Sequence, residues 1–243
     1  MKTIHVVQHT SAEYLGMIED HLEGRGVRFA YSRPFTAEGK LPLAGTVRDG
    51  LVLLGGGPWG SAGERDLPTL KEEIELARGC LARNWPLVGI GLGAQIVAIA
   101  AGGGSERSPL EFSVARAART RDDALGGYVP TDYPIALYGR DRALPPPGAD
   151  VLSRDSDGRP ALWRIGARAI GFSAHPGLKV AMVEDLVMEF EESPADVQAT
   201  LPLLRAAQRE LEDALVPLMT GLVSLAGWME PVTGLDSIPV RRA

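Results

Sequence analysis

The chain has 243 residues, of which 45% are hydrophobic and 23% charged, with a formal net charge of −6. This composition is too apolar for a disordered chain and lacks the basic excess typical of a nucleic-acid binder. Its one cysteine, Cys80, excludes an intramolecular disulfide and any metal site built from two or four cysteines. The first residues lack the apolar core of a signal peptide, and no run approaches 18 uninterrupted apolar residues. We therefore expect a cytoplasmic protein with no membrane contact.

The first hundred residues alternate between strand-like and helix-like stretches. Short apolar runs predict buried strands, and apolar residues at three- and four-residue spacing predict helices. This order is typical of a doubly wound α/β sheet with mostly parallel strands. The expected strands are 4–7, 27–31, 50–54 and 86–90, and the expected helices are about 12–23 (capped by Ser11), 67–83 and 94–101.

The pattern changes after residue 111. Short β-like pieces alternate with turns, which predicts a small antiparallel excursion at one side of the sheet; they are 112–117, 135–138, 161–165 and 169–172. A helical C-terminal segment follows over about 180–229, with helices expected at 180–192 and at 195–219, the second lightly broken by Pro202 and Pro217. Leucines recur at helical spacing over 201–228, either to pack across the domain or to form a dimer interface. Since there is no internal repeat, we expect one domain over 1–243.

Three sharp turns follow expected strands, where α/β sheets bind ligands. The glycines of 55–60 either let the backbone approach a ligand or form a plain loop. The turn 89–95 reads as a dinucleotide fingerprint, as a nucleophile elbow centred on Gly91, or as a turn that only allows close packing. His175, just past a strand, is either a general base or an ordinary loop histidine.

Together these turns resemble the class I glutamine amidotransferases, which have a Gly-Gly-Pro loop, a G-x-C-x-G-x-Q elbow and a late His-Pro-Glu. The resemblance covers most of residues 1–177 and implies a flavodoxin-like sheet. In that family the elbow cysteine attacks the glutamine amide, the histidine is its base, and the glutamate orients the histidine.

Transferred by position, the resemblance places Gly91 at the nucleophile and Gly177 at the acid, so both positions are vacant, while His175 keeps the base position. It also places the N–H groups of Gly57 and Leu92 at the oxyanion hole. Gln95 stands where the family contacts its substrate, or is an ordinary helix residue.

Two side chains could be considered as replacements for the missing nucleophile. We expect Cys80 to be a buried packing residue, because it shares a helix face with Leu76 and Ala77. Ser173 lies two residues before His175, so alternation along a strand would put both on one face.

We therefore expect a protein that does not hydrolyse glutamine and acts as a ligand-binding or scaffolding subunit of a biosynthetic complex. The alternative is an enzyme repurposed for other chemistry in the same pocket, with His175 as acid/base and the oxyanion hole retained. A small-molecule ligand and either a synthase partner or a homodimer are expected. No cofactor, metal or nucleic acid is expected.

Overall fold

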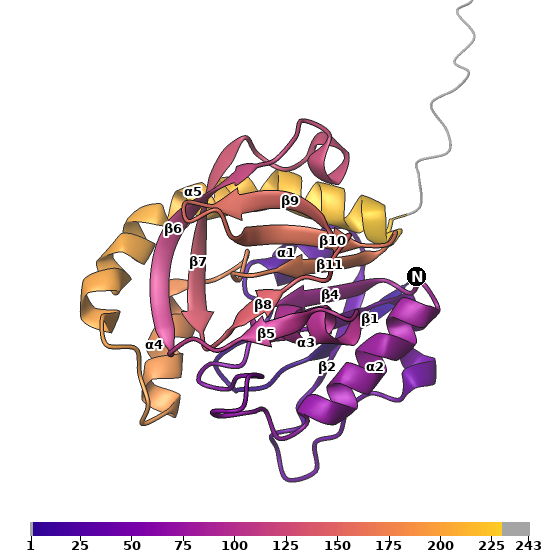
Figure 1. Ribbon diagram of the computed structural model, residues 1–243, viewed down its shortest axis with the longest axis horizontal. Coiled ribbons are helices and arrows are strands. Elements are labelled where there is room, and N and C mark those ends of the chain that lie inside the picture. Colours follow the sequence, from indigo (N-terminus) through magenta and orange to yellow (C-terminus); the bar gives the residue numbers. More distant parts are fainter. Residues whose placement is uncertain (1, 230–243) are drawn as a thin grey trace, which may run out of the picture.

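The computed structural model describes residues 2–229, and its centre is a nine-stranded mixed sheet (Figure 1). The strand order is β2-β1-β3-β4-β11-β10-β9-β6-β7. The first five strands in this order run parallel, and each of the last four runs antiparallel to its neighbours. The α/β fold class is thus confirmed, with its antiparallel excursion at one side of the sheet. The strands are β1 Thr3–Val7, β2 Arg28–Ser32, β3 Leu51–Leu53, β4 Leu87–Ile90, β6 Glu111–Arg119, β7 Asp132–Gly139, β9 Asp150–Asp155, β10 Pro160–Ile165 and β11 Ala169–Phe172.

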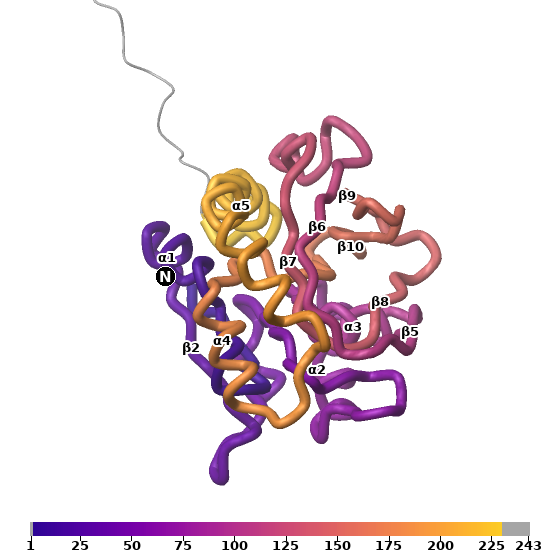
Figure 2. Tube along the Cα trace, turned by 90° about the vertical axis from the view of Figure 1, so that its left-hand side faces the viewer, coloured from indigo at the N-terminus to yellow at the C-terminus, as the bar shows by residue number. Residues whose placement is uncertain are grey.

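Helices cover both faces of the sheet. α1 (Ile18–Glu23), α4 (Val180–Glu189) and α5 (Val197–Ala226) pack on one face, and α2 (Leu70–Ala82) and α3 (Leu92–Ala100) on the other (Figure 2). The strand β3 is apolar on both faces, so both faces must be covered: Val52 joins the apolar core on one side of the sheet, and Leu51 and Leu53 join the core on the other. A strand buried on both faces is a continuous apolar run, as its sequence predicts.

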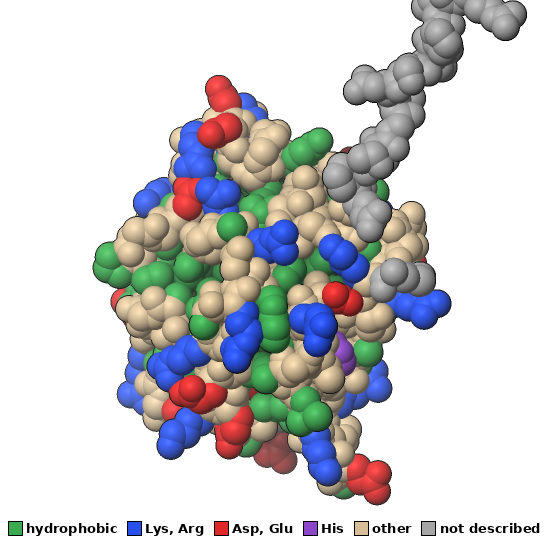
Figure 3. All heavy atoms as spheres, turned by 90° about the vertical axis from the view of Figure 1, so that its right-hand side faces the viewer, with side chains coloured by type: hydrophobic (Ala, Val, Ile, Leu, Met, Phe, Trp, Pro, Cys, Tyr) green, Lys and Arg blue, Asp and Glu red, His purple; other side chains and the backbone are tan. Residues whose placement is uncertain are grey.

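Smaller elements complete the fold. A separate two-stranded sheet pairs β5 (Gly104–Glu106) with β8 (Arg142–Leu144) in antiparallel fashion. Short 3-10 helices occupy Ala44–Asp49 and Ala124–Gly127. None of the described helices is both long enough and apolar enough to cross a lipid bilayer. The expected single domain includes residues 230–243, which lie outside the described part of the chain. Figure 3 shows in space-filling form the face on the right-hand side of Figure 1.

The helix expected over 12–23 is wrong in its first half, because α1 begins only at Ile18. The preceding segment forms a turn instead. In it the Glu13 N–H donates to the Thr10 hydroxyl, and Gly16 has a φ of +64°, which a right-handed helix does not allow. Ser11 is not a helix cap, because Met17 precedes α1 at the N-cap position; the Ser11 N–H instead donates to the carboxylate of Glu189 in α4. A contact across 178 residues cannot be read from helical spacing.

The expected break in the last helix is also wrong, because α5 runs unbroken through Pro202 and Pro217. A proline removes one hydrogen bond from a helix interior, and burial of the helix's apolar face offsets this loss. α5 lies across β6 and β7. The leucine stripe therefore packs within the domain; its buried members are Leu204, Leu211, Leu215, Leu218 and Leu222.

Candidate functional site

A cavity of about 310 Å³ lies at the carboxyl ends of β4 and β11, where the sheet's first antiparallel strands begin. Gly91 and Gln95 line it from the start of α3, and Ser173 and Ala174 line it from the end of β11. Strands β5, β6, β7 and β8 and the turn between β9 and β10 supply the other walls. This is the end of a parallel sheet where α/β proteins bind ligands. Among residues 2–229, no group of three or more His, Cys, Asp or Glu side chains is arranged to hold a metal ion.

Gly91 forms the turn between β4 and α3 with φ +56° and ψ −114°, a conformation that L side chains rarely adopt. A Cβ added there would first meet the Cα of Gly55 at 3.4 Å, which is an ordinary contact distance. The turn therefore has the sharp strand-to-helix geometry of a nucleophile elbow and has room for a side chain. Cys80, in contrast, is fully buried in α2, as expected, and burial raises the pKa of its thiol to about 11.

The two N–H groups assigned to the oxyanion hole differ in their partners. The N–H of Gly57 donates to the Glu13 carboxylate over 2.9 Å, whereas that of Leu92 meets no acceptor in the described part of the chain. Neither residue lines the cavity. Burial raises the pKa of Glu13 to about 7, with the Gly57 hydrogen bond acting in the opposite direction.

Gln95 lines the cavity, but its amide is already used within the protein. Its nitrogen donates to the Arg140 carbonyl over 2.7 Å, and its oxygen accepts from the Ser61 hydroxyl over 2.6 Å. The side chain thus joins the loop after β3 to the end of β7. In this state Gln95 fixes a wall of the cavity.

The ring of His175 is buried, and both of its nitrogens are hydrogen-bonded to backbone. Nδ1 accepts from the Gly177 N–H over 3.1 Å, so Nε2 carries the hydrogen and donates to the Tyr14 carbonyl over 2.8 Å. Burial lowers the pKa of His175 to about 4. The ring does not line the cavity, and Ser173, which does, donates to the Pro160 carbonyl instead. The structure therefore shows no hydrogen bond between Ser173 and His175.

Gly177 has no room for a side chain. A Cβ added there would lie 2.9 Å from both the Leu15 carbonyl oxygen and Cγ1 of Ile18. The Met17 N–H also donates to the Gly177 carbonyl over 3.0 Å. The segment that leads into α1 thus fills the space that the resemblance assigns to the triad acid.

Sequence reasoning missed a buried polar pair beneath the Gly55–Gly57 turn. His9 Nδ1 lies 2.9 Å from the Gly55 carbonyl oxygen, and Nε2 lies 2.9 Å from the Glu73 carboxylate. Burial alone would lower the pKa of His9, but the charge and hydrogen bond of Glu73 outweigh it and raise the pKa. His9 and Glu13 both follow the end of a parallel strand, and that position could have identified them.

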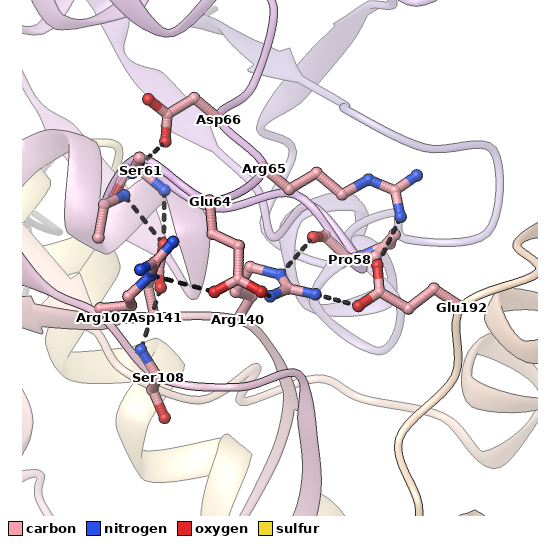
Figure 4. A network of polar contacts seen from close by, with 12 residues as sticks. Pro58, Ser61, Glu64, Arg65, Asp66, Arg107, Ser108, Arg140, Asp141 and Glu192 are labelled. Atoms are coloured by element: carbon pink, nitrogen blue, oxygen red, sulfur yellow. Dashed lines mark hydrogen bonds and ion pairs between the residues drawn. The ribbon is translucent and has the colours of Figure 1, made fainter.

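A polar network fixes the loop after β3 next to the cavity (Figure 4). Arg140 is buried; it donates to the Pro58 carbonyl over 3.0 Å and pairs with Glu64 at 2.9 Å and with Glu192. The adjacent Asp141, which lines the cavity, accepts N–H groups from both the loop and the segment before β6; the donors are Ser61, Ala62 and Ser108.

Solved structures share this fold at low sequence identity. A glutamine amidotransferase from Methylobacillus flagellatus has a TM-score of 0.77 and 22% identity, covering 98% of this chain and 100% of its own. One from Thermotoga maritima has a TM-score of 0.78 and 23% identity, covering 93% of this chain and 98% of its own. A proposed GMP synthase component from Thermoplasma acidophilum has a TM-score of 0.54 and 17% identity, covering 88% of this chain and 98% of its own.

The chain therefore has the fold of class I glutamine amidotransferases. No protein-family model matches its sequence, and no curated protein matches it either.

Proposed function

We propose that this protein does not hydrolyse glutamine and that it acts as a ligand-binding or scaffolding subunit of a biosynthetic complex in the cytoplasm. The observation that carries the proposal is the turn at Gly91. It has the shape of a nucleophile elbow and borders a cavity, yet the residue at its centre has no side chain. The chain's one thiol, Cys80, is buried in α2.

The surroundings of His175 favour this proposal over a repurposed enzyme. A general base must reach the proton that it removes and must have a free lone pair. The Nδ1 lone pair of His175 accepts the Gly177 N–H, and Nε2 donates to the Tyr14 carbonyl. Glu13 holds the N–H of Gly57, so one of the two N–H groups assigned to the oxyanion hole is also engaged.

A synthase is the partner that we propose. One solved structure with this fold is described as a proposed subunit of a GMP synthase, which supports a role beside a second protein. A homodimer is the other possibility, and the oligomeric state of the purified chain distinguishes it from a complex with a different protein.

An ammonia-release assay with L-glutamine tests the central claim. We expect the full chain to release ammonia at the rate of a no-protein blank, because loss of triad members lowers the rate by several orders of magnitude. Glutamine-dependent release well above the blank, which disappears in a His175→Asn variant, would overturn the proposal.

A further inference from the structure

We infer that the cavity next to Gly91 takes a small organic cation, an aliphatic amine or a guanidine compound, in preference to an anion. The inference rests on the ligand-binding role proposed above and specifies the chemical class of that ligand. It depends on the charges that line the cavity and on which of them already have partners.

Acidic groups outnumber basic groups on the cavity wall. Five carboxylates and two guanidinium groups line it, a formal excess of three negative charges; they are Glu106, Glu111, Asp141, Asp155 and Asp157, against Arg142 and Arg159. In a concave site with low-dielectric walls, such an excess attracts a cation and repels an anion more strongly than it would on an open surface.

Both guanidinium groups are already paired within the cavity wall. Arg142 lies 3.0 Å from the Glu111 carboxylate, and Arg159 lies 2.9 Å from that of Asp157. An anionic ligand would have to compete with a carboxylate for either arginine. Releasing that carboxylate would add another unpaired negative charge next to the incoming anion.

The other carboxylates are not equally free to bind a ligand. Asp141 accepts three backbone N–H groups, and Oδ1 of Asp155 accepts those of Asp157 and Arg159. Glu106, at the end of β5, is exposed at the rim of the cavity and meets no side-chain hydrogen-bond or ion-pair partner in the part of the chain that the structure describes. It is therefore the carboxylate that a bound ammonium or guanidinium group would reach without displacing a protein group.

The cavity volume guides the choice of probe molecules. About 310 Å³ corresponds to the share of liquid volume of roughly ten water molecules. An open chain of about five carbons with a polar group at each end fits this space. A series of five-carbon probes that differ only in their end groups therefore isolates the effect of charge.

We would titrate the full chain at pH 7 with 1,5-diaminopentane, 5-aminopentanoate and glutarate, and measure the dissociation constants by calorimetry. We expect the diamine to bind one per chain at least fivefold more tightly than glutarate, with the zwitterion between them. Glutarate binding as tightly as the diamine would overturn the inference while leaving a ligand-binding cavity in place. If none of the three binds at 10 mM, both the cation inference and the ligand-binding role fail, although the absence of glutamine hydrolysis does not depend on this result.

Two variants locate the binding. Glu106→Gln should weaken diamine binding about two- to fivefold, as removal of one charge partner in a solvated site does. Glu72→Gln, which removes an exposed carboxylate of α2 that does not line the cavity, should leave it unchanged. Equal weakening by both variants would mean that the diamine binds the acidic surface in general, and would overturn the inference.

Discussion

Glu13 accepts a hydrogen bond from the backbone N–H of Gly57 over 2.9 Å, at a position that the family resemblance assigns to the oxyanion hole. The contact needs a glycine at position 55, because a Cβ on Gly55 would lie 1.6 Å from Oε1 of Glu13. The turn at Gly55–Gly57 therefore encloses the Glu13 carboxyl group and also donates a hydrogen bond to it. An acid within the fold thus uses a donor that an amidotransferase would direct at its substrate.

The buried Glu13 should make the protein less stable as the pH rises from 4.5 to 7. Its pKa rises from 4.5 to about 7 on folding, so the folded state binds the extra proton in this interval. The stabilisation is fully present below pH 4.5 and is lost as the pH passes 7, an effect on the order of 3 kcal/mol. Urea unfolding of the natural chain and of Glu13→Gln between pH 4 and 8 measures it as the difference between the two profiles. Glu13→Gln, which keeps an acceptor for Gly57, should remove the Glu13 contribution, and the same profile in both proteins would contradict the assignment.

His175 should act in the opposite direction. Its pKa falls from 6.5 to about 4 on folding, so the folded state binds fewer protons in this interval and stability is lost as the pH falls. The effects of Glu13 and His175 therefore nearly cancel between pH 4.5 and 6.5 in the natural chain. In Glu13→Gln the free energy of unfolding should rise with pH over this range, and in His175→Asn it should fall. The same slope in both variants would refute this account.

Placing a thiol at the elbow should create a reactive cysteine without creating a glutaminase. The backbone conformation of Gly91 costs a cysteine about 1–3 kcal/mol, but its Cβ has space, so Gly91→Cys should fold. A thiol reagent should label one group per folded chain of the variant and none of the natural chain, because Cys80 is buried. Ammonia release should stay at the blank, since His175 is not available as a base.

Gly102→Cys is the matched control, because it places a thiol at an exposed glycine that also has positive φ. It should be labelled as Gly91→Cys is. Rapid glutamine hydrolysis by Gly91→Cys alone would show that His175 can leave its backbone partners.

A methyl group at the vacant acid position should destabilise the protein. In Gly177→Ala the Cβ would meet the Leu15 carbonyl oxygen at 2.9 Å, and forcing the segment before α1 outward should cost about 1–3 kcal/mol. Gly139→Ala, at the end of β7, adds the same methyl group where nothing lies within 4 Å. The free energy of unfolding measured in urea should therefore be lower for Gly177→Ala than for Gly139→Ala. Equal stabilities would mean that the segment before α1 yields easily.

Removing one member of the His9–Glu73 pair should lower the free energy of unfolding strongly, and replacing both members should add less than a second loss of the same size. Removing one partner leaves the other buried ionisable group without its opposite charge, so His9→Leu and Glu73→Leu should each cost about 3–5 kcal/mol. The double variant should lose less than the sum of the two, because it leaves neither charge alone. A double-mutant cycle measured by urea unfolding gives this coupling energy, and additive losses would contradict the pairing.

The sheet could be predicted where local pattern and burial agree. The strands β3, β4 and β11 appeared as apolar runs, because a strand buried on both faces has no polar alternation to obscure it. The short strand β9, with Arg154 and Asp155, and the pair of β5 and β8 were missed. These strands are partly exposed, and β5 and β8 pair with each other although they are distant in sequence.

For the site, the sequence alone determined which side chains are available: glycine at 91 and 177, one histidine at 175, and a single cysteine in the wrong helix. The residue types at these positions do not depend on how the chain folds. Only the tertiary structure decided where the hydrogen bonds of His175, Gln95 and Gly57 go, and it directed them to Tyr14, Arg140 and Glu13. Those partners are 161, 45 and 44 residues away, and hydrogen bonds over such separations depend on how the layers pack. A sequence pattern specifies what a residue can donate or accept, whereas its partner is fixed only when the chain is folded.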